Sequence, residues 1–309
     1  MRSYTEPELG LMLLYALPGE NRLRESLFRR LSVAVKELGQ TPEPELELEL
    51  DEGELRRLGC TRQETDEILR RLTQRQLLQG YLQGLSRKGI RVITRISPEY
   101  PQRLRETLGD RAPLVLFCAG ALSLMERQCM SLVGSRKLRP AGKNFARCVG
   151  NAAARQGYCY CSGGAAGADT EGFCGAMEQG GCSVLFLADS LEEHLTDRRY
   201  RRYLRDKKLL LVSEQGPDLP FSTPRAMSRN RLIHAMGQKV FVAQSDYGTG
   251  GTWNGTMENL KEGWSPVFVY DGEPEEPGTR GLLERGAEPV SLSQLEQLSA
   301  LGLQQTSLF

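Results

Sequence analysis

The sequence is poor in the residues that usually bind metal ions, and it carries almost no net charge. It has only two histidines, His194 and His234, and its eight cysteines include no C-x-x-C pair. A zinc site needs four ligands at characteristic spacings, so we expect no metal site and interpret the cysteines as buried, reduced thiols. Lys and Arg together number 40 against 39 for Asp and Glu. This balance excludes a whole-chain basic signature for nucleic acid, so any such binding must come from a local patch.

Long apolar runs are also missing. The run LGLMLLYAL at residues 9–17 is too short to span a bilayer, and the acidic residues Glu6 and Glu8 precede it where a signal peptide has basic ones. It predicts a buried first helix. Since no other stretch is a transmembrane candidate, we expect a cytoplasmic protein without a membrane partner.

The residue pattern changes once along the chain, whose length suits about two domains. Residues 1–85 carry Leu, Arg, Glu and Gln at helical spacing and predict a small helical N-terminal domain. Within them PEPELELELDEGEL alternates with strand period although Glu and Leu prefer helix, so a short strand or a linker remains open. From residue 86 to 300, apolar runs such as CMSLVG, SVLFLAD and PVFVYDG alternate with helical segments. This alternation predicts an α/β fold with a doubly wound, mostly parallel sheet, followed by a tail at residues 301–309.

Three of the predicted strands end in loops of small, polar or basic residues. Glycine lets backbone N–H groups approach a ligand closely, and a helix N-terminus presents unpaired donors with a partial positive charge. Because the carboxyl ends of parallel strands share one edge of the sheet, the loops predict an anion site, most simply for phosphate. The alternative is that the glycines only permit tight turns. The candidate residues are Gly134, Ser135, Arg136 and Lys137 in the first loop, Ser162, Gly163 and Gly164 in the second, and Gly250, Gly251 and Thr252 in the third.

The fingerprints of common cofactor and catalytic sites are absent from these loops. The sequence has no G-x-G-x-x-G followed by a ribose-binding acid, no G-x-x-x-x-G-K-[ST] and no G-x-S-x-G. We therefore expect no cofactor and no catalytic residues. His194 and His234 are interpreted as surface or helix-packing histidines rather than catalytic bases.

Two basic elements are further candidates for contact with an anion. In SRNRLIHAM, Ser228 is a plausible N-cap, which puts Arg229, Asn230 and Arg231 at a helix start, where an anion would offset their charge. The alternative is a solvated pair of surface arginines. The run DRRYRRYLRDKK alternates Arg and Tyr, which suits either a nucleic-acid contact or a solvated helix with its tyrosines packed inward.

The order of several segments resembles the bacterial DNA-processing protein A (DprA/Smf) family. LVGSRKLRPAGKNFA, YCYCSGGAAGADTEGFCGAMEQGG, LLLVSEQ, MSRNRLIHAMGQKVFVAQ and the closing RGLLERGAEPVSL carry the likeness, which covers about residues 88–295. The resemblance implies an extended Rossmann-like domain that binds single-stranded DNA. It also implies a homodimer without enzymatic activity that helps to load the RecA recombinase during natural transformation or recombination.

Carried over by motif, the DNA-binding residues would be Gly134, Ser135 and Arg136, then Ser162, Gly163, Gly164 and Asp169, then Arg229, Asn230 and Arg231. The chain also departs from the family. Ala226 and Met227 stand where Phe-Pro usually precedes R-N-R, and TGGTWNGTMENL replaces the S-G-S-L-x-T-A loop. Too few residues follow Val290 for the winged helix that many members carry, so we expect a divergent member of the family.

The TGGTWNGTMENL departure supports a rival interpretation. It partly resembles the P-G-G-x-G-T-x-x-E motif of the LOG family of nucleotide phosphoribohydrolases, in which Glu258 would assist cleavage of a glycosidic bond. No proline precedes the glycines, and the spacing departs by an insertion. A nucleotide-sensing Rossmann-like domain is a third possibility.

The last five residues, QTSLF, resemble the Q-L-[SD]-L-F motif by which bacterial proteins dock onto the sliding clamp. Gln305, Leu308 and Phe309 would provide the contacts, the two apolar side chains filling a groove of the clamp. The alternative is that Leu308 and Phe309 fold back onto their own domain.

Overall fold

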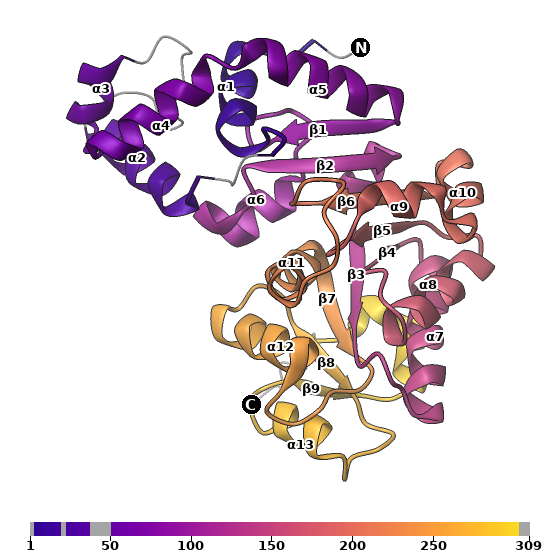
Figure 1. Ribbon diagram of the computed structural model, residues 1–309. Helices are drawn as coiled ribbons and strands as arrows, with labels where there is room; N and C mark the ends of the chain where they lie inside the picture. Colours follow the sequence, from indigo (N-terminus) through magenta and orange to yellow (C-terminus); the bar gives the residue numbers. More distant parts are fainter. Residues whose placement is uncertain (1–2, 20–22, 38–50, 303–309) are drawn as a thin grey trace. The chain divides into compact units, whose positions relative to one another are not determined.

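The computed structural model describes residues 3–19, 23–37 and 51–302, and the chain divides into two compact units (Figure 1). The first unit comprises Met1–Tyr100 and Asp110–Phe117, and the second comprises Pro101–Gly109 and Cys118–Phe309. The sequence predicts a boundary between two domains after residue 85. The compact units are defined by contacts and do not test that boundary, which stays a prediction.

The first unit is mainly helical in its described part. It contains α1 (Glu6–Tyr15), α2 (Glu25–Glu37), α3 (Glu52–Arg57), α4 (Arg62–Leu72), α5 (Arg75–Arg87), strand β1 (Ile90–Thr94) and the first half of β2 (Val115–Gly120). The buried helix predicted from the apolar run at residues 9–17 is α1, which begins at a capping box of Thr5 and Glu8 and buries its side chains from Leu11 to Tyr15. None of the described helices is long and apolar enough to cross a membrane.

The Glu/Leu segment PEPELELELDEGEL falls mostly outside the described residues. Its last residues begin α3, where Asp51 accepts a hydrogen bond from the backbone N–H of Glu54. The choice between strand and linker concerns residues 42–50, which the structure does not describe.

A parallel sheet forms the centre of the second unit, as the sequence predicts. Its strands lie in the order β6-β5-β4-β3-β7-β8-β9, and each strand is parallel to its neighbours in this order. The strands are β3 (Cys129–Val133), β4 (Cys159–Ser162), β5 (Ser183–Phe186), β6 (Leu209–Ser213), β7 (Gly237–Val242), β8 (Val267–Tyr270) and β9 (Glu288–Val290). The sequence did not predict β9, because this edge strand has only three residues and two of them are exposed.

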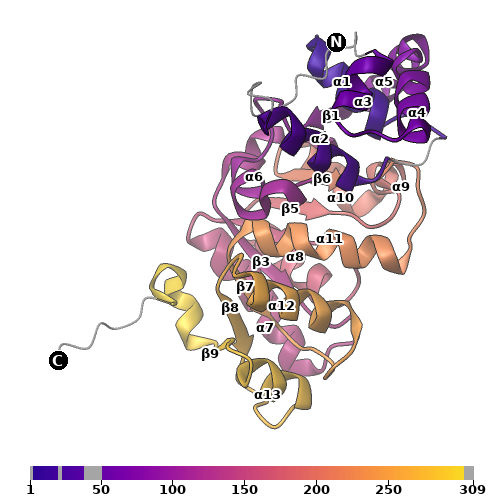
Figure 2. The same cartoon turned by 90° about the vertical axis from the view of Figure 1, so that its left-hand side faces the viewer.

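Helices cover both faces of this sheet (Figures 1 and 2). The helices α11 (Thr223–Met236) and α12 (Gly250–Glu262) lie side by side on one face, with α7 (Pro140–Arg155) and α8 (Ala168–Glu178) on the other. The remaining helices of the unit are α6 (Gln102–Leu108), α9 (Leu191–Thr196), α10 (Arg198–Arg205) and α13 (Pro277–Leu283), with the 3₁₀ segment Ser293–Ala300 after β9. The strand order reverses at β3, which pairs with β4 on one side and β7 on the other. In a doubly wound sheet, ligands bind beyond the carboxyl ends of the strands at such a switch point.

Candidate nucleic-acid interface

A groove of about 740 Å³ lies at this switch point. Two of the three predicted loops line it: Gly134 to Lys137 after β3, and Thr249 to Thr252 after β7. From the second loop only Ala165 lines it, together with Asp169 at the start of α8. Helix α11 contributes Arg229 and Asn230 to the remaining wall. The structure therefore brings together most, but not all, of the candidate residues.

The first loop presents two exposed cations to the groove. Arg136 and Lys137 are exposed, and neither forms an ion pair with a carboxylate among the described residues. The Arg136 guanidinium lies over the ring of Phe221, 4.8 Å from its centroid, which orients the charge without neutralising it. Backbone hydrogen bonds hold the loop: Ser135 donates its N–H to the Gln244 carbonyl at 2.9 Å, and Lys137 donates its N–H to Ser135 Oγ at 3.1 Å.

The second loop uses its backbone donors internally. Asp169 Oδ2 accepts the N–H groups of Gly163 and Ala165 at 3.2 and 3.1 Å, so these donors are engaged within the protein. A Cβ at Gly163 would lie 1.1 Å from Arg229 Nη1, so only glycine fits beside that guanidinium. The remaining candidates of this loop, Ser162 and Gly164, do not line the groove, and Ser162 is buried with its hydroxyl donated to the Leu132 carbonyl at 2.7 Å.

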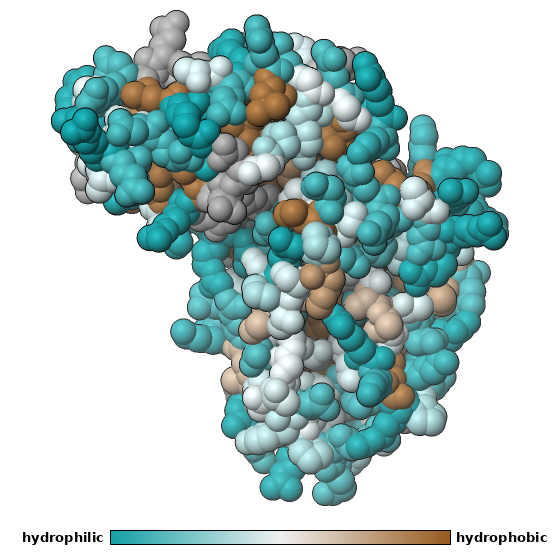
Figure 3. Space-filling model, viewed as in Figure 1, coloured by the Kyte–Doolittle hydropathy of each residue, from teal (hydrophilic) through white to brown (hydrophobic). Residues whose placement is uncertain are grey.

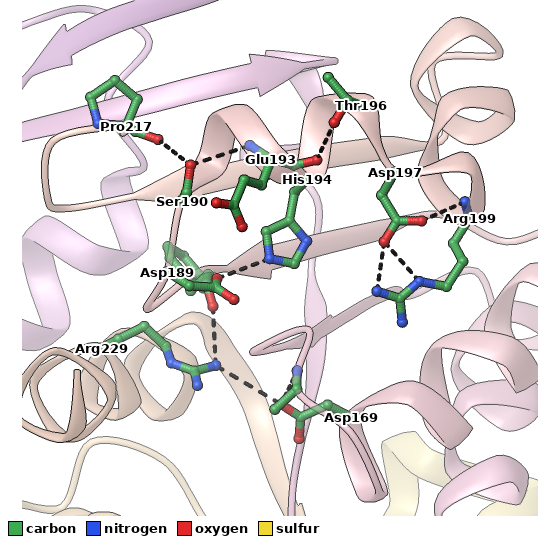
Figure 4. A network of polar contacts seen from close by, with 12 residues as sticks. Asp169, Asp189, Ser190, Glu193, His194, Thr196, Asp197, Arg199, Pro217 and Arg229 are labelled. Atoms are coloured by element: carbon green, nitrogen blue, oxygen red, sulfur yellow. Dashed lines mark hydrogen bonds and ion pairs between the residues drawn. The ribbon is translucent and has the colours of Figure 1, made fainter. Parts of the chain in front are cut away.

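The arginine that faces this loop is buried and paired (Figure 4). Arg229 is 6% exposed, donates to the Phe186 carbonyl at 3.0 Å and lies 3.9 Å from Asp169 Oδ2. Burial raises the pKa of the Asp169 carboxyl and lowers the pKa of the Arg229 guanidinium, while the charge of each partner counters the shift of the other. This pair holds the second loop against α11. The positive charge of Arg229 is therefore already balanced by Asp169.

The predicted start of the R-N-R helix is wrong. Helix α11 begins at Thr223, with Ser222 as its N-cap and a proline in its first turn, so Ser228 lies inside the helix. Arg231 is buried against Glu214, with Nη2 2.7 Å from Oε2, and is not among the groove residues. Asn230 donates to the Gly251 carbonyl at 2.9 Å and ties α11 to the third loop.

The third loop opens α12 onto the groove. Thr249 is the N-cap residue, but its side chain makes no capping hydrogen bond. Gly250 has φ of +84°, a conformation that side-chain-bearing residues rarely adopt. The first backbone donors of α12 therefore face the groove without a side-chain acceptor, which is an arrangement that suits an anion.

The remaining candidates lie elsewhere. Glu258, eight residues beyond the start of α12, is half-buried and is not among the groove residues, so it does not share a site with the glycines. His194 Nε2 is 2.9 Å from Asp189 Oδ1 (Figure 4), whereas His234 is fully buried in α11. In α10 the tyrosines pack inward, since the rings of Tyr200 and Tyr203 both meet Phe173 edge-on with centroids 5.5 Å away. The arginines of α10 are exposed, which agrees with the interpretation of a solvated helix.

Sequence reasoning missed several side chains of the groove, three of which bear on its chemistry. Phe221, Met227 and Asp246 line it and are exposed. The sequence pattern around Phe221 gave little indication of a site, because this residue lies in the irregular segment before α11. Asp246 directly precedes the glycine-rich loop and could have been included with it.

A Rossmann-like α/β protein with a groove at the switch point of its sheet is thus the class that fold and site define. The family model of DNA recombination-mediator protein A matches residues 91–300, and the chain belongs to this family. It is 29% identical over 203 residues to DNA processing protein DprA of Streptococcus pneumoniae, a match that covers 63% of this chain and 69% of the relative. It is 28% identical over 224 residues to Protein Smf of Escherichia coli, covering 69% of this chain and 57% of that protein.

Solved structures agree with the fold. DprA from Streptococcus pneumoniae superposes with a TM-score of 0.71 at 21% identity, covering 96% of this chain and 98% of that one. DNA processing protein A from Helicobacter pylori, whose structure was determined to explain its single-stranded DNA binding mode, superposes with a TM-score of 0.56 at 23% identity, covering 67% and 94%. At these identities the likeness concerns the fold alone.

Proposed function

We propose that the second unit binds single-stranded DNA through its phosphate backbone, along the groove between the first and third loops. The observation that carries this proposal is the meeting of two exposed cations, Arg136 and Lys137, with the uncapped start of α12 on one groove. Family membership and the single-stranded DNA binding named for the Helicobacter pylori protein support the choice of polymer.

The groove suits binding that does not depend on base sequence. Cations and backbone N–H groups contact phosphate oxygens, which every nucleotide carries, so they position a strand without reading its bases. Gly250 and Gly251 keep the backbone of the third loop accessible, and Asn230 holds that loop in place.

Binding of an oligo-dT strand tests this proposal. Wild-type protein should bind at low salt and lose affinity as salt rises, because cations displaced by the protein are released into solution. Arg136→Ala should weaken binding about 10-fold or more, since it removes a charge-assisted contact worth about 1.5–3 kcal/mol. Arg201→Ala is the matched control, because Arg201 is an exposed arginine of α10 outside the groove. No binding at low salt, or equal losses in the two variants, would contradict the proposal.

The proposal extends to a role in recombination. As a family member the chain would act as a cytoplasmic homodimer that assists a RecA-type recombinase in reaching single-stranded DNA, without a catalytic step of its own. Faster assembly of the recombinase on a strand in the presence of the protein, lost in Arg136→Ala, is the expected result. Sedimentation tests the dimer separately.

A contact with the sliding clamp is a separate proposal from the sequence. Gln305, Leu308 and Phe309 lie outside the described residues, so it depends on the QTSLF motif alone. Deleting Leu308 and Phe309 should abolish clamp binding and leave the melting temperature unchanged. A large loss of stability would mean that these side chains belong to the core.

A further inference from the structure

In the second unit, exposed large apolar side chains gather at the groove and beside it. In the described part of the second unit four of them are strongly exposed: Phe221, Met227, Tyr247 and Leu292. Phe221 and Met227 line the groove, and Tyr247 lies between Asp246 and Thr249, which also line it. Single exposed apolar residues are common on proteins, but phosphate contacts do not explain two that line a groove with a third beside it. Elsewhere, on the face shown in Figure 3, hydrophilic side chains dominate the second unit and apolar residues appear as small, separate patches.

Tyr247 is the most exposed of these side chains, at 53%, and yet its ring is held in place. The ring of Trp253 lies 4.9 Å away between centroids, and the Arg285 guanidinium lies 5.6 Å from the Tyr247 centroid. Arg285 Nη2 also lies 3.4 Å from the tyrosine hydroxyl. A Cβ at Gly281 of α13 would come within 2.5 Å of the ring, so this glycine makes room for it. A half-exposed aromatic ring with fixed neighbours is a ready surface for stacking.

The charges at this end of the groove favour a base over a phosphate. Asp246 presents an exposed carboxylate beside Tyr247, and the Arg285 guanidinium is engaged by Glu284 at 3.8 Å. The Asp246 carboxylate repels a phosphate, whereas a base is uncharged and stacks on an aromatic ring whatever its identity. A strand that crosses the third loop on leaving the groove would bring a base to Tyr247.

We propose that Tyr247, supported by Trp253 and Arg285, is a stacking platform for a base of the bound strand where it leaves the groove. This inference rests on the proposed binding of single-stranded DNA and deepens it: phosphates are held by the first loop and the start of α12, and a base by Tyr247. Sequence motifs could not indicate this, because Arg285, which supports the ring, lies 38 positions beyond Tyr247 in the chain.

Two strands of equal charge test the platform. A 12-mer of thymidylate is compared with a 12-mer of abasic residues, which keeps every phosphate but has no bases. The measured quantity is the ratio of the two affinities for wild-type protein, Tyr247→Phe, Tyr247→Leu and Tyr247→Ala. The Phe variant keeps the aromatic face, and the Leu variant keeps apolar packing without it.

Wild type and Tyr247→Phe should prefer the strand with bases by the same factor. Tyr247→Leu and Tyr247→Ala should lower that preference about 5-fold or more, with unchanged affinity for the abasic strand. Equal preference in wild type and Tyr247→Leu overturns the platform, even where Arg136→Ala still weakens both strands and the proposed function holds. If neither strand binds wild-type protein at low salt, the proposed function fails and the platform fails with it. Unchanged melting temperatures identify the variants that fold normally.

Discussion

At the residue scale, Asp246 places a carboxylate on the same groove as Arg136 and Lys137. Its side chain is exposed and has no cationic partner among the described residues. A carboxylate near a bound phosphate costs about 1 kcal/mol at 4 Å in water, so Asp246→Asn should strengthen oligo-dT binding about 5-fold at low salt. Asp218→Asn is the control, because Asp218 is exposed and does not line the groove. An unchanged or weaker affinity in Asp246→Asn would mean that the bound strand does not run close to Asp246.

A second residue, His234, makes stability depend on pH. Burial lowers the pKa of its imidazole to about 3 from 6.5, and neither ring nitrogen has a hydrogen-bond partner among the described residues. As pH falls below 6.5 the unfolded chain takes up a proton here and the folded chain does not, down to about pH 3, so stability is lost across this range. Between pH 7 and pH 5 the loss should be about 2 kcal/mol.

Urea unfolding of wild type and His234→Leu at both pH values measures this contribution. Leucine cannot titrate, so the variant should lose about 2 kcal/mol less than wild type between pH 7 and pH 5. All other side chains are the same in the two proteins, so the difference between them reports on position 234. Equal losses would show that the ring of His234 reaches water in the folded state.

At the scale of elements, α7 and α8 pack through glycines. A Cβ at Gly150 of α7 would lie 1.9 Å from the Gly172 carbonyl oxygen of α8, and one at Gly175 would lie 2.2 Å from the Arg147 carbonyl oxygen. Gly150→Ala should therefore destabilise the second unit by about 1–3 kcal/mol, although alanine favours a helix by about 1 kcal/mol. The fluorescence of Trp253 and Trp264, the two tryptophans of the chain, reports its unfolding.

Gly84→Ala in α5 is the matched control for this substitution. Nothing lies within 4 Å of the position of its Cβ, and its φ is not positive, so alanine should stabilise the first unit by about 0.5–1 kcal/mol. Thermal unfolding of both variants and of wild type, followed by circular dichroism, compares the two changes in stability. A stabilised Gly150→Ala would mean that the two helices can move apart at little cost.

The elements also explain how far the sequence could predict this protein. Continuous apolar runs predicted β3 to β8 correctly, because strands buried on both faces need apolar residues throughout. The edge strand β9 is exposed at two of its three positions and leaves no such signal. The start of α11 was missed because both Ser222 and Ser228 have the chemistry of an N-cap.

The candidate site was predictable at the level of loops more than of side chains. The topology brings the ends of β3 and β7 together, and a strand-helix pattern is enough to indicate this. The pattern cannot indicate that Asp169 takes up the donors of the second loop, nor that Glu214 neutralises Arg231, since these partners are distant in sequence or depend on loop geometry. The DNA-binding roles of the candidate residues stay predictions.

For the whole molecule, the near balance of charge means that affinity for DNA should reflect a few local cations. For single strands, the logarithm of the binding constant falls with the logarithm of salt concentration by about 0.7 for each phosphate contacted. Two contacts, from Arg136 and Lys137, give a slope of about −1.4.

The salt dependence therefore distinguishes the groove from the exposed arginines of α10 as the path of the strand. Arg136→Ala should reduce the slope to about −0.7, because one phosphate contact is lost. The double variant Arg201→Ala/Arg205→Ala removes two exposed charges of α10 and should leave the slope unchanged. Fluorescence anisotropy of a labelled dT 12-mer over a series of salt concentrations measures both. A wild-type slope of about −3 that becomes shallower in the α10 variant would mean that the strand runs across the basic helix and contacts several more phosphates there.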